Sequence, residues 1–143
     1  MSGARGIPLP HPTPLSRPHW DGCREGRLLV QRCGACGRHV FVPQPLCPTC
    51  QSAELAWVEC RGTGSLYSFT VVHRPQRPEF DVPYVVAIVE LDEGAFLLTN
   101  LVDCPHDAIE IGMRVEVTFR KMSEEIALPW FKPSAASRPA DTA

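Results

Sequence analysis

The chain has 143 residues, the size of one ordinary domain or of two very small ones. Hydrophobic residues make up 44% of it and charged residues 21%, as in a globular protein, and no run approaches the roughly 18 apolar residues that span a bilayer. The net charge of −2 argues against a surface for nucleic-acid phosphates, because such domains are usually strongly basic. The first residues lack the apolar segment of a signal peptide, so we expect a cytoplasmic protein with reduced thiols.

Prolines gather at both ends of the chain. Five of the fifteen lie in residues 1–18, and three more stand at positions 129, 133 and 139. Proline fixes φ and donates no backbone hydrogen bond, so proline-rich ends favour tails or extended arms over packed structure. We therefore expect disordered tails over 1–16 and 134–143, with a helix and metal ribbon over 17–61 and a barrel over 62–133 between them.

A short helix is predicted where the ordered chain begins. Pro18 suits a first helical turn, and Trp20 and Cys23 lie three residues apart on one helical face. Trp20 either fills the edge of a core or faces a partner, and the sequence gives both interpretations about equal weight.

Two Cys-x-x-Cys pairs, ten residues apart, follow in the stretch CGACGRHVFVPQPLCPTC. Each such turn places two sulfurs on one side of a metal, and a glycine after the second cysteine lets the first turn close. Four thiolates complete the tetrahedral sphere of Zn²⁺ and leave no position for water or substrate, so the predicted site is structural. Its ligands are Cys33, Cys36, Cys47 and Cys50. A redox dithiol, two disulfides and an iron centre are the alternatives.

Short strands flank these turns at residues 27–31, 38–42 and 57–61, with too few apolar side chains to fold without metal. The remaining cysteines at 23, 60 and 104 are expected to be small buried or half-buried hydrophobes.

Five strands are predicted after residue 62. SLYSFTVVH alternates, with Tyr67, Phe69 and Val71 on one face, and YVVAIVEL is apolar on both faces, as in a buried central strand. The turn at 92–94 ends in a glycine where a positive φ is needed, and AFLLTNLV returns antiparallel.

The second half of this region completes a recognisable order. DCPHDAIEIG fits a short helix that ends at Gly112, and RVEVTFRKM alternates with Val115, Val117 and Phe119 inward. EIALPWFKP follows as a last strand, which its prolines at 129 and 133 confine to an edge. Three strands, a short helix and two strands is the order of an OB-fold, a partly open five-stranded barrel.

The segments HWDGCREGRLLVQRCGACGRHVFVPQPLCPTC, GTGSLYSFTVVHRP, PYVVAIVELDEGAFLLTNL and IGMRVEV together resemble the acyl-CoA-associated zinc-ribbon/OB-fold family, long classed as a domain of unknown function. The resemblance covers residues 17 to 133. It implies a mainly β protein with a short N-terminal helix, a rubredoxin-like zinc ribbon and a five-stranded OB-fold. It also implies that the four cysteines of the two pairs bind zinc and that no catalytic residue carries over.

The same resemblance implies a function. Members of the family are non-catalytic accessory subunits that dock on a thiolase-like enzyme, which is a thiolase, acyltransferase, aldolase or hydratase, and support acyl-CoA handling, with at most indirect contact to acyl-CoA. Trp20, His73 and Arg74 are the candidate contacts with the partner or with CoA. His73 and Arg74 end the first barrel strand, where solvation alone also explains them.

Two other functions remain as alternatives. Binding of single-stranded nucleic acid would need a basic groove with aromatic platforms, and the aromatic residues at 67, 69, 96 and 119 are expected to be taken mostly by the core. A stand-alone hydratase or acyltransferase would have to use Cys104, His106 or His73, none of which has an evident orienting partner.

Overall fold

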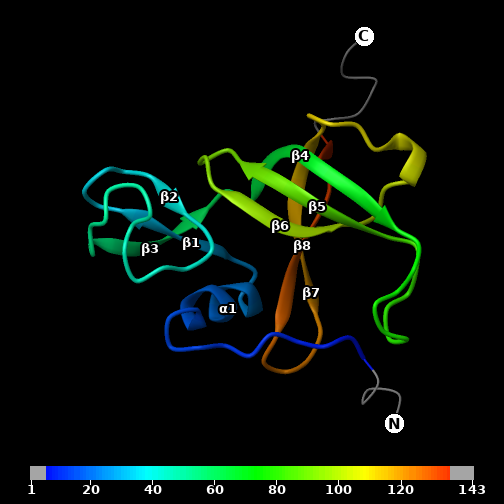
Figure 1. Ribbon diagram of the computed structural model, residues 1–143, viewed down its shortest axis with the longest axis horizontal. Coiled ribbons are helices and arrows are strands. Elements are labelled where there is room, and N and C mark those ends of the chain that lie inside the picture. Colours follow the sequence, from blue (N-terminus) through cyan, green and yellow to red (C-terminus); the bar gives the residue numbers. More distant parts are fainter. Residues whose placement is uncertain (1–5, 136–143) are drawn as a thin grey trace.

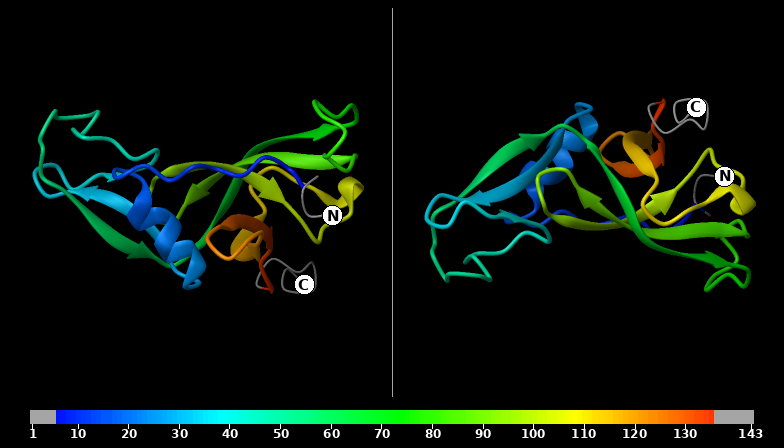
Figure 2. Two further views of the ribbon diagram at one scale, coloured as in Figure 1. Left: turned by 90° about the horizontal axis from the view of Figure 1, so that it is seen from below. Right: turned by 90° about the horizontal axis from the view of Figure 1, so that it is seen from above.

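A small three-stranded sheet and a closed β-barrel lie at opposite ends of an elongated molecule (Figures 1 and 2). The computed structural model describes residues 6–135. The elements in chain order are helix α1 (Arg17–Arg24), the ribbon strands β1 (Leu28–Cys33), β2 (His39–Val40) and β3 (Leu55–Cys60), the barrel strands β4 (Thr63–Val72), β5 (Tyr84–Leu91) and β6 (Phe96–Leu101), the short 3₁₀ helix η2 (His106–Ala108), and the barrel strands β7 (Arg114–Lys121) and β8 (Ala127–Pro133). The predicted mainly β fold is thus confirmed.

The predicted disordered tails fall only partly on described residues. Positions 1–5 and 136–143 lie outside the part of the chain that the structure describes. Residues 6–16 form no helix or strand, although Ile7 and Leu9 are half-buried. We keep the predicted division into tails, ribbon and barrel as a proposal. None of the helices within residues 6–135 is long and apolar enough to cross a membrane.

Helix α1 packs closely on strand β1. It carries proline in its first turn, as expected, and buries His19 and Cys23. Gly22 permits the close approach, because a Cβ atom there would meet the carbonyl oxygen of Arg27 and the side chain of Leu29 at 2.9 Å each. Any larger residue at this position would push the helix off the ribbon.

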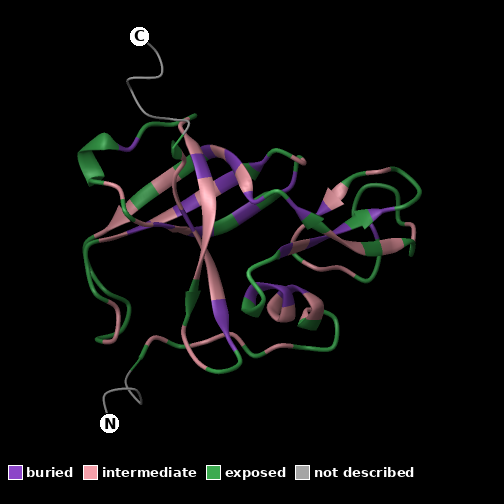
Figure 3. Ribbon diagram, turned by 180° about the vertical axis from the view of Figure 1, so that it is seen from behind, coloured by how far each residue is buried: buried purple, intermediate pink, exposed green. Residues whose placement is uncertain are grey.

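The ribbon is an antiparallel sheet with the strand order β2-β1-β3. Its own buried cluster is small, consisting of Cys33, Val40 and Cys47 with the half-buried Leu55 against them. The other ends of β1 and β3 instead bury Leu28, Val30 and Cys60 in the main core of the barrel. Figure 3 shows buried residues where these strands enter the barrel. The ribbon therefore has little core of its own and shares one with its neighbour.

The barrel has the strand order β4-β5-β6-β8-β7 and closes through pairing of β4 with β7. This is the predicted OB-fold order, with β5 as the central strand between β4 and β6. The inward side chains of all five strands form one cluster, with Leu66, Val89, Leu97, Val115 and Phe131 among its fully buried members. Val117 and Phe119 of β7 pack against this cluster, as predicted.

The prediction that β8 lies at an edge is wrong. β8 pairs with β7 along its whole length and closes the barrel against β6 through the single parallel pair Leu101 and Phe131. The backbone of Pro129 faces β6, where its carbonyl oxygen accepts a hydrogen bond from Thr99 Oγ1 at 2.7 Å. Because the ladder on this side is so short, the missing N–H of a proline costs no sheet hydrogen bond.

The predicted helix before β7 is also wrong in extent. Only the single 3₁₀ turn of η2 forms, because Ile109 leaves it in an extended conformation and buries its side chain in the core. Gly94 ends the predicted turn with a φ of 106°. Gly112, which was expected to end the helix, also has a positive φ, of 90°, although η2 already ends at Ala108.

Strand β4 contains a bulge that the alternating sequence did not reveal. Leu66 pairs with Val89 and Ser68 with Ile88, so Tyr67 is an extra residue without a partner on β5. Phe69 and Val71 pack against the core, but the side chain of Tyr67 points outward and is 56% exposed. The prediction that these three side chains share one face is therefore wrong for Tyr67.

Candidate metal centre and docking face

The ribbon brings the four predicted cysteine ligands together. All four sulfurs lie within 4.8 Å of one another. Cys33 Sγ is 3.6 Å from Cys50 Sγ, and Cys36 Sγ is 3.7 Å from Cys47 Sγ. A tetrahedral metal with bonds of about 2.3 Å to sulfur needs sulfur–sulfur distances of about 3.8 Å. The four side chains therefore fit a tetrahedral metal ion, which they would hold from two turns facing each other.

Backbone N–H groups point at the sulfurs from within each turn. The N–H of Cys36 donates to Cys33 Sγ at 3.5 Å, and the N–H of Thr49 donates to Cys47 Sγ at 3.4 Å. The N–H groups of Cys50 and Thr49 lower the pKa of Cys47 to about 6, and those of Cys36 and Ala35 lower the pKa of Cys33. The turns thus favour the thiolate form at Cys33 and Cys47. At Cys50 the N–H of Ser52 acts in the same direction, but the neighbouring Cys33 sulfur and burial outweigh it and raise the pKa of this thiol to about 12.

The two turns close in the same way with different residues. Gly37 has a φ of 80°, as predicted from its place after the second cysteine, and its N–H donates to the carbonyl oxygen of Cys33. Gln51 stands in the equivalent place of the second turn, with a φ of 69° and the matching bond to the carbonyl oxygen of Cys47. The second turn therefore adopts the glycine conformation without a glycine.

Sequence reasoning missed a buried histidine that joins the helix to the ribbon. His19 is 2% exposed, and its Nδ1–H donates to the carbonyl oxygen of Leu29 at 3.0 Å. Its Nε2 lies 3.7 Å from Cys23 Sγ, and its ring packs on Phe41 with the centroids 4.9 Å apart. Burial lowers the pKa of His19, against the opposing effect of the bond to Leu29, and burial raises the pKa of Cys23 to about 12. Both groups are therefore neutral, with the thiol as donor to Nε2.

The candidate nucleophile does not meet a base. The thiol of Cys104 bonds to the carbonyl oxygen of Pro105 at 3.5 Å, and burial, with a smaller effect from Asp107, raises its pKa. Among residues 6–135 no hydrogen bond joins this thiol to His106 or His73. A protonated thiol without a base is a poor nucleophile, so this set of side chains offers no acyl-transfer centre.

Large apolar side chains lie exposed along one side of the molecule, and we call Val42, Tyr67, Phe96 and Leu98 the apolar face. Their exposed fractions are 63%, 56%, 43% and 72%. Tyr67 and Phe96 meet edge to face with ring centroids 4.9 Å apart, and Leu98 follows Phe96 two residues along β6. The expectation that the core takes most of the aromatic side chains is thus wrong for Tyr67 and Phe96. Exposed apolar side chains that adjoin one another are typical of a protein interface.

A groove of about 370 Å³, here called the ribbon groove, extends the apolar face where the ribbon meets the barrel. Trp20 lines it from α1 and Leu98 from β6, and the remaining lining is Ser16, His19, residues 41–43, Leu97, Thr99, Asn100 and residues 128–130. None of these residues carries a charge, since His19 is neutral. His73 and Arg74 are exposed beyond the end of β4 and do not line this groove.

Comparison with known proteins agrees with this architecture. Residues 20–56 match the family model described as the ChsH2 rubredoxin-like zinc ribbon domain, and residues 57–120 match the ChsH2 C-terminal OB-fold domain. A DUF35 domain-containing scaffold protein of Methanocaldococcus jannaschii is 38% identical over 109 residues, which cover 74% of this chain and 77% of the relative. The chain belongs to the DUF35 family of zinc-ribbon and OB-fold proteins.

Within this family the similarity extends to longer proteins and to solved structures. A probable enoyl-CoA hydratase alpha subunit of Thermomonospora curvata is 45% identical over 115 residues, covering 80% of this DUF35 chain. This chain spans 36% of the length of that subunit. A chain in the structure of the Ltp2-ChsH2(DUF35) aldolase matches with a TM-score of 0.79 and 42% identity, over 87% of this chain and 98% of that one.

Proposed function

We propose that this DUF35 chain is a non-catalytic accessory subunit that docks on a thiolase-like acyl-CoA enzyme and supports its handling of acyl-CoA. The enzyme would be a thiolase, acyltransferase, aldolase or hydratase. The observation that carries the proposal is the apolar face, where four large apolar side chains from the ribbon and the barrel lie exposed on the same side of the molecule. The likeness to nearly the whole length of a chain in the Ltp2-ChsH2(DUF35) aldolase structure supports this choice of partner.

The metal centre supports a structural rather than a catalytic role. With four thiolates around the metal, every tetrahedral position is taken by protein, so neither water nor a thioester oxygen has a place to bind. The ion we propose is Zn²⁺, since four cysteine thiolates at tetrahedral spacing are typical of structural zinc, although they also suit iron. The seven cysteines are all unpaired, which agrees with a reducing, cytoplasmic setting.

Nucleic-acid binding, the alternative function, gains no support. The aromatic side chains of the apolar face are exposed, but the residues that form this face carry no positive charge, and the whole chain has a net charge of −2. Binding of single strands combines stacking with a basic groove along the backbone.

The proposal is tested by co-expression with a thiolase-like acyl-CoA enzyme of the same organism, followed by measurement of the mass of the purified species. We expect a complex that contains both chains. Leu98→Asp should abolish it, because burial of an unpaired carboxylate in an apolar interface is costly. Ile111→Asp is the matched control, since Ile111 is 62% exposed but lies outside the apolar face. A wild-type chain that stays monomeric beside the enzyme would contradict the proposal.

A further inference from the structure

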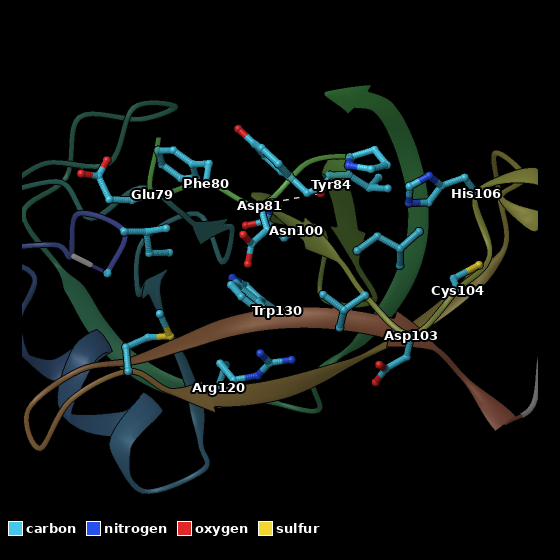
Figure 4. Close-up of a pocket in the computed structure, with 17 residues that line it drawn as sticks. Glu79, Phe80, Asp81, Tyr84, Asn100, Asp103, Cys104, His106, Arg120 and Trp130 are labelled. Atoms are coloured by element: carbon cyan, nitrogen blue, oxygen red, sulfur yellow. Dashed lines mark hydrogen bonds between the residues drawn. The ribbon is translucent and has the colours of Figure 1, made fainter. Parts of the chain in front are cut away.

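A second groove, here called the loop groove, shares the lining residues Asn100 and Trp130 with the ribbon groove and has a volume of about 520 Å³. The loop between β4 and β5 forms one wall, with Phe80 and Tyr84 stacked at a centroid distance of 5.7 Å. Trp130 of β8 forms the opposite wall, and Val85 and Leu101 are among the apolar residues between them. Figure 4 shows Asp81 and Asn100 between Tyr84 and Trp130.

Hydrogen bonds hold the loop groove in shape. Tyr84 donates its hydroxyl proton to Gln76 Oε1 at 2.8 Å, which ties the loop to the start of β5. Asn100 Nδ2 donates to the carbonyl oxygen of Val85 at 2.9 Å, which fixes the amide between the two walls. The groove is thus formed before any partner arrives, so binding there costs little ordering of its walls.

The two grooves differ in charge. The ribbon groove has no charged lining, whereas Asp81 and Asp103 line the loop groove and make no ion pair with any residue between 6 and 135. Glu79 also lines the loop groove, but Arg77 pairs with it at 3.2 Å. The groove contains one arginine, Arg120, which stacks on Trp130 at 4.6 Å, and Figure 4 shows it beyond Trp130 from Asp81. The space between Tyr84 and Trp130 therefore favours a cation over an anion.

We propose that the loop groove binds a lysine or arginine side chain of the partner enzyme, on the same segment whose apolar side chains cover the ribbon groove. This inference rests on the proposed function. Trp130 and Asn100 line both grooves, so one continuous segment crosses from one to the other. The aromatic walls attract the cation through their π faces, and Asp81 pairs with it. Because only the loop groove carries unpaired carboxylates among the described residues, the cationic end of the segment lies there and its apolar end lies in the ribbon groove. The same carboxylates disfavour the phosphates of CoA as occupants of the loop groove.

Charge variants of the exposed loop test this inference. With the complex of the full chain and its partner enzyme, Asp81→Lys should weaken binding about tenfold or more at low salt, and Asp81→Asn should weaken it less. Raising the salt concentration should weaken the wild-type complex more than the Asp81→Asn complex, because one attractive charge pair is then missing. Asp107→Lys is the matched control, since Asp107 is exposed on η2 and does not line the groove.

A partner variant completes the test. Changing the contacting lysine or arginine of the enzyme to glutamate should restore binding to Asp81→Lys. If Asp81→Lys binds like the wild type while Leu98→Asp abolishes the complex, the inference about the loop groove is overturned and the proposed function stands. If the wild-type chain forms no complex with the enzyme, both are overturned. Metal content and circular dichroism of each variant establish that it is folded.

Discussion

The ribbon and the barrel are stabilised in different ways, although they share a boundary. Among residues 6–135 the barrel cluster has fourteen buried members, whereas the ribbon cluster has three, two of which are candidate metal ligands. Leu28, Val30 and Cys60 reach from the ribbon strands into the barrel cluster. The ribbon therefore depends on the proposed metal at one end and on the barrel at the other, while the barrel depends mainly on apolar burial.

The largest expected effect is loss of the ribbon after Cys47→Ser. A structural zinc site contributes on the order of 10 kcal/mol of binding free energy, far more than three buried residues supply. We expect the variant to lose its metal and the amide protection of residues 28–60, and to lose partner docking, while β4 to β8 stay protected. Hydrogen exchange and metal analysis measure this. Cys104→Ser is the control, and a Cys47→Ser protein that keeps its metal and its complex would refute the prediction.

A substitution in the barrel core should weaken both regions. Phe131 is fully buried, and Phe131→Ala should lower the free energy of unfolding by about 3–5 kcal/mol through lost burial and a cavity. Because β1 and β3 share this core, the ribbon should lose protection together with the barrel. Denaturant unfolding followed by exchange of both regions checks this outcome. A variant in which only the barrel weakens would show that the two cores are independent.

His19 provides a pH-dependent test of the contact between helix and ribbon. Burial lowers its pKa below 6.5, so the unfolded chain binds more protons as the pH falls through that value, and stability falls with it. His19→Gln should cost about 1–2 kcal/mol at pH 7.5 and flatten this dependence. Thermal unfolding between pH 7.5 and 5.5 measures the difference from the wild type. His106→Gln is the matched control, because it replaces an exposed histidine that lies outside the contact between helix and ribbon.

A smaller effect is expected for Asp92, which lies in the turn between β5 and β6. Asp92 accepts hydrogen bonds from Arg114 Nη1 and Nη2 at 2.9 and 2.7 Å, and these bonds, followed by one from Thr63, lower its pKa to about 2. The stabilisation is present above the ordinary value of 3.8 and is lost as the pH falls through about 2. Asp92→Asn should cost about 1 kcal/mol at pH 7, a gap that narrows in acid.

A matched surface pair tests whether this effect is specific to the barrel. Asp21 pairs with Arg24 at 2.9 Å, and both side chains are more than 40% exposed. Asp21→Asn should therefore cost less than about 0.5 kcal/mol, since a solvated pair contributes little. Equal losses in the two variants, measured by denaturant unfolding at pH 7, would place Asp92 among ordinary surface charges.

Much of the fold and the four cysteines that fit a metal ion could be predicted from local sequence patterns. The Cys-x-x-Cys turns and the strand periods are local features, so Cys47 and the alternation of β7 were accessible without tertiary information. The predictions that were wrong concerned features that depend on contacts with distant parts of the chain. Ile109 left the helical path because the barrel core needed its side chain, and β8 gained its position from closure against Leu101.

The apolar face was harder to predict from the sequence than the metal centre. Whether an aromatic side chain on an alternating strand points in or out depends on the register with its neighbour, and register is not visible in one strand. The role of His19 depends on a carbonyl ten residues later, at Leu29. Its spacing of four from Cys23 was the one local sign that the two side chains meet.

The bulge at Tyr67 separates two requirements that usually compete at one strand residue, namely pairing and packing within the sheet and contact with a partner at the surface. An ordinary strand residue must satisfy its ladder partner and its packing neighbours, so changing it for the sake of a binding surface disturbs the fold. Tyr67 is the extra residue of its strand and has no partner on β5. Because its side chain is exposed, only contacts at the surface constrain which residue can stand there. The apolar face thus contains a position where the preference for a partner can be altered while the barrel beneath it keeps its register.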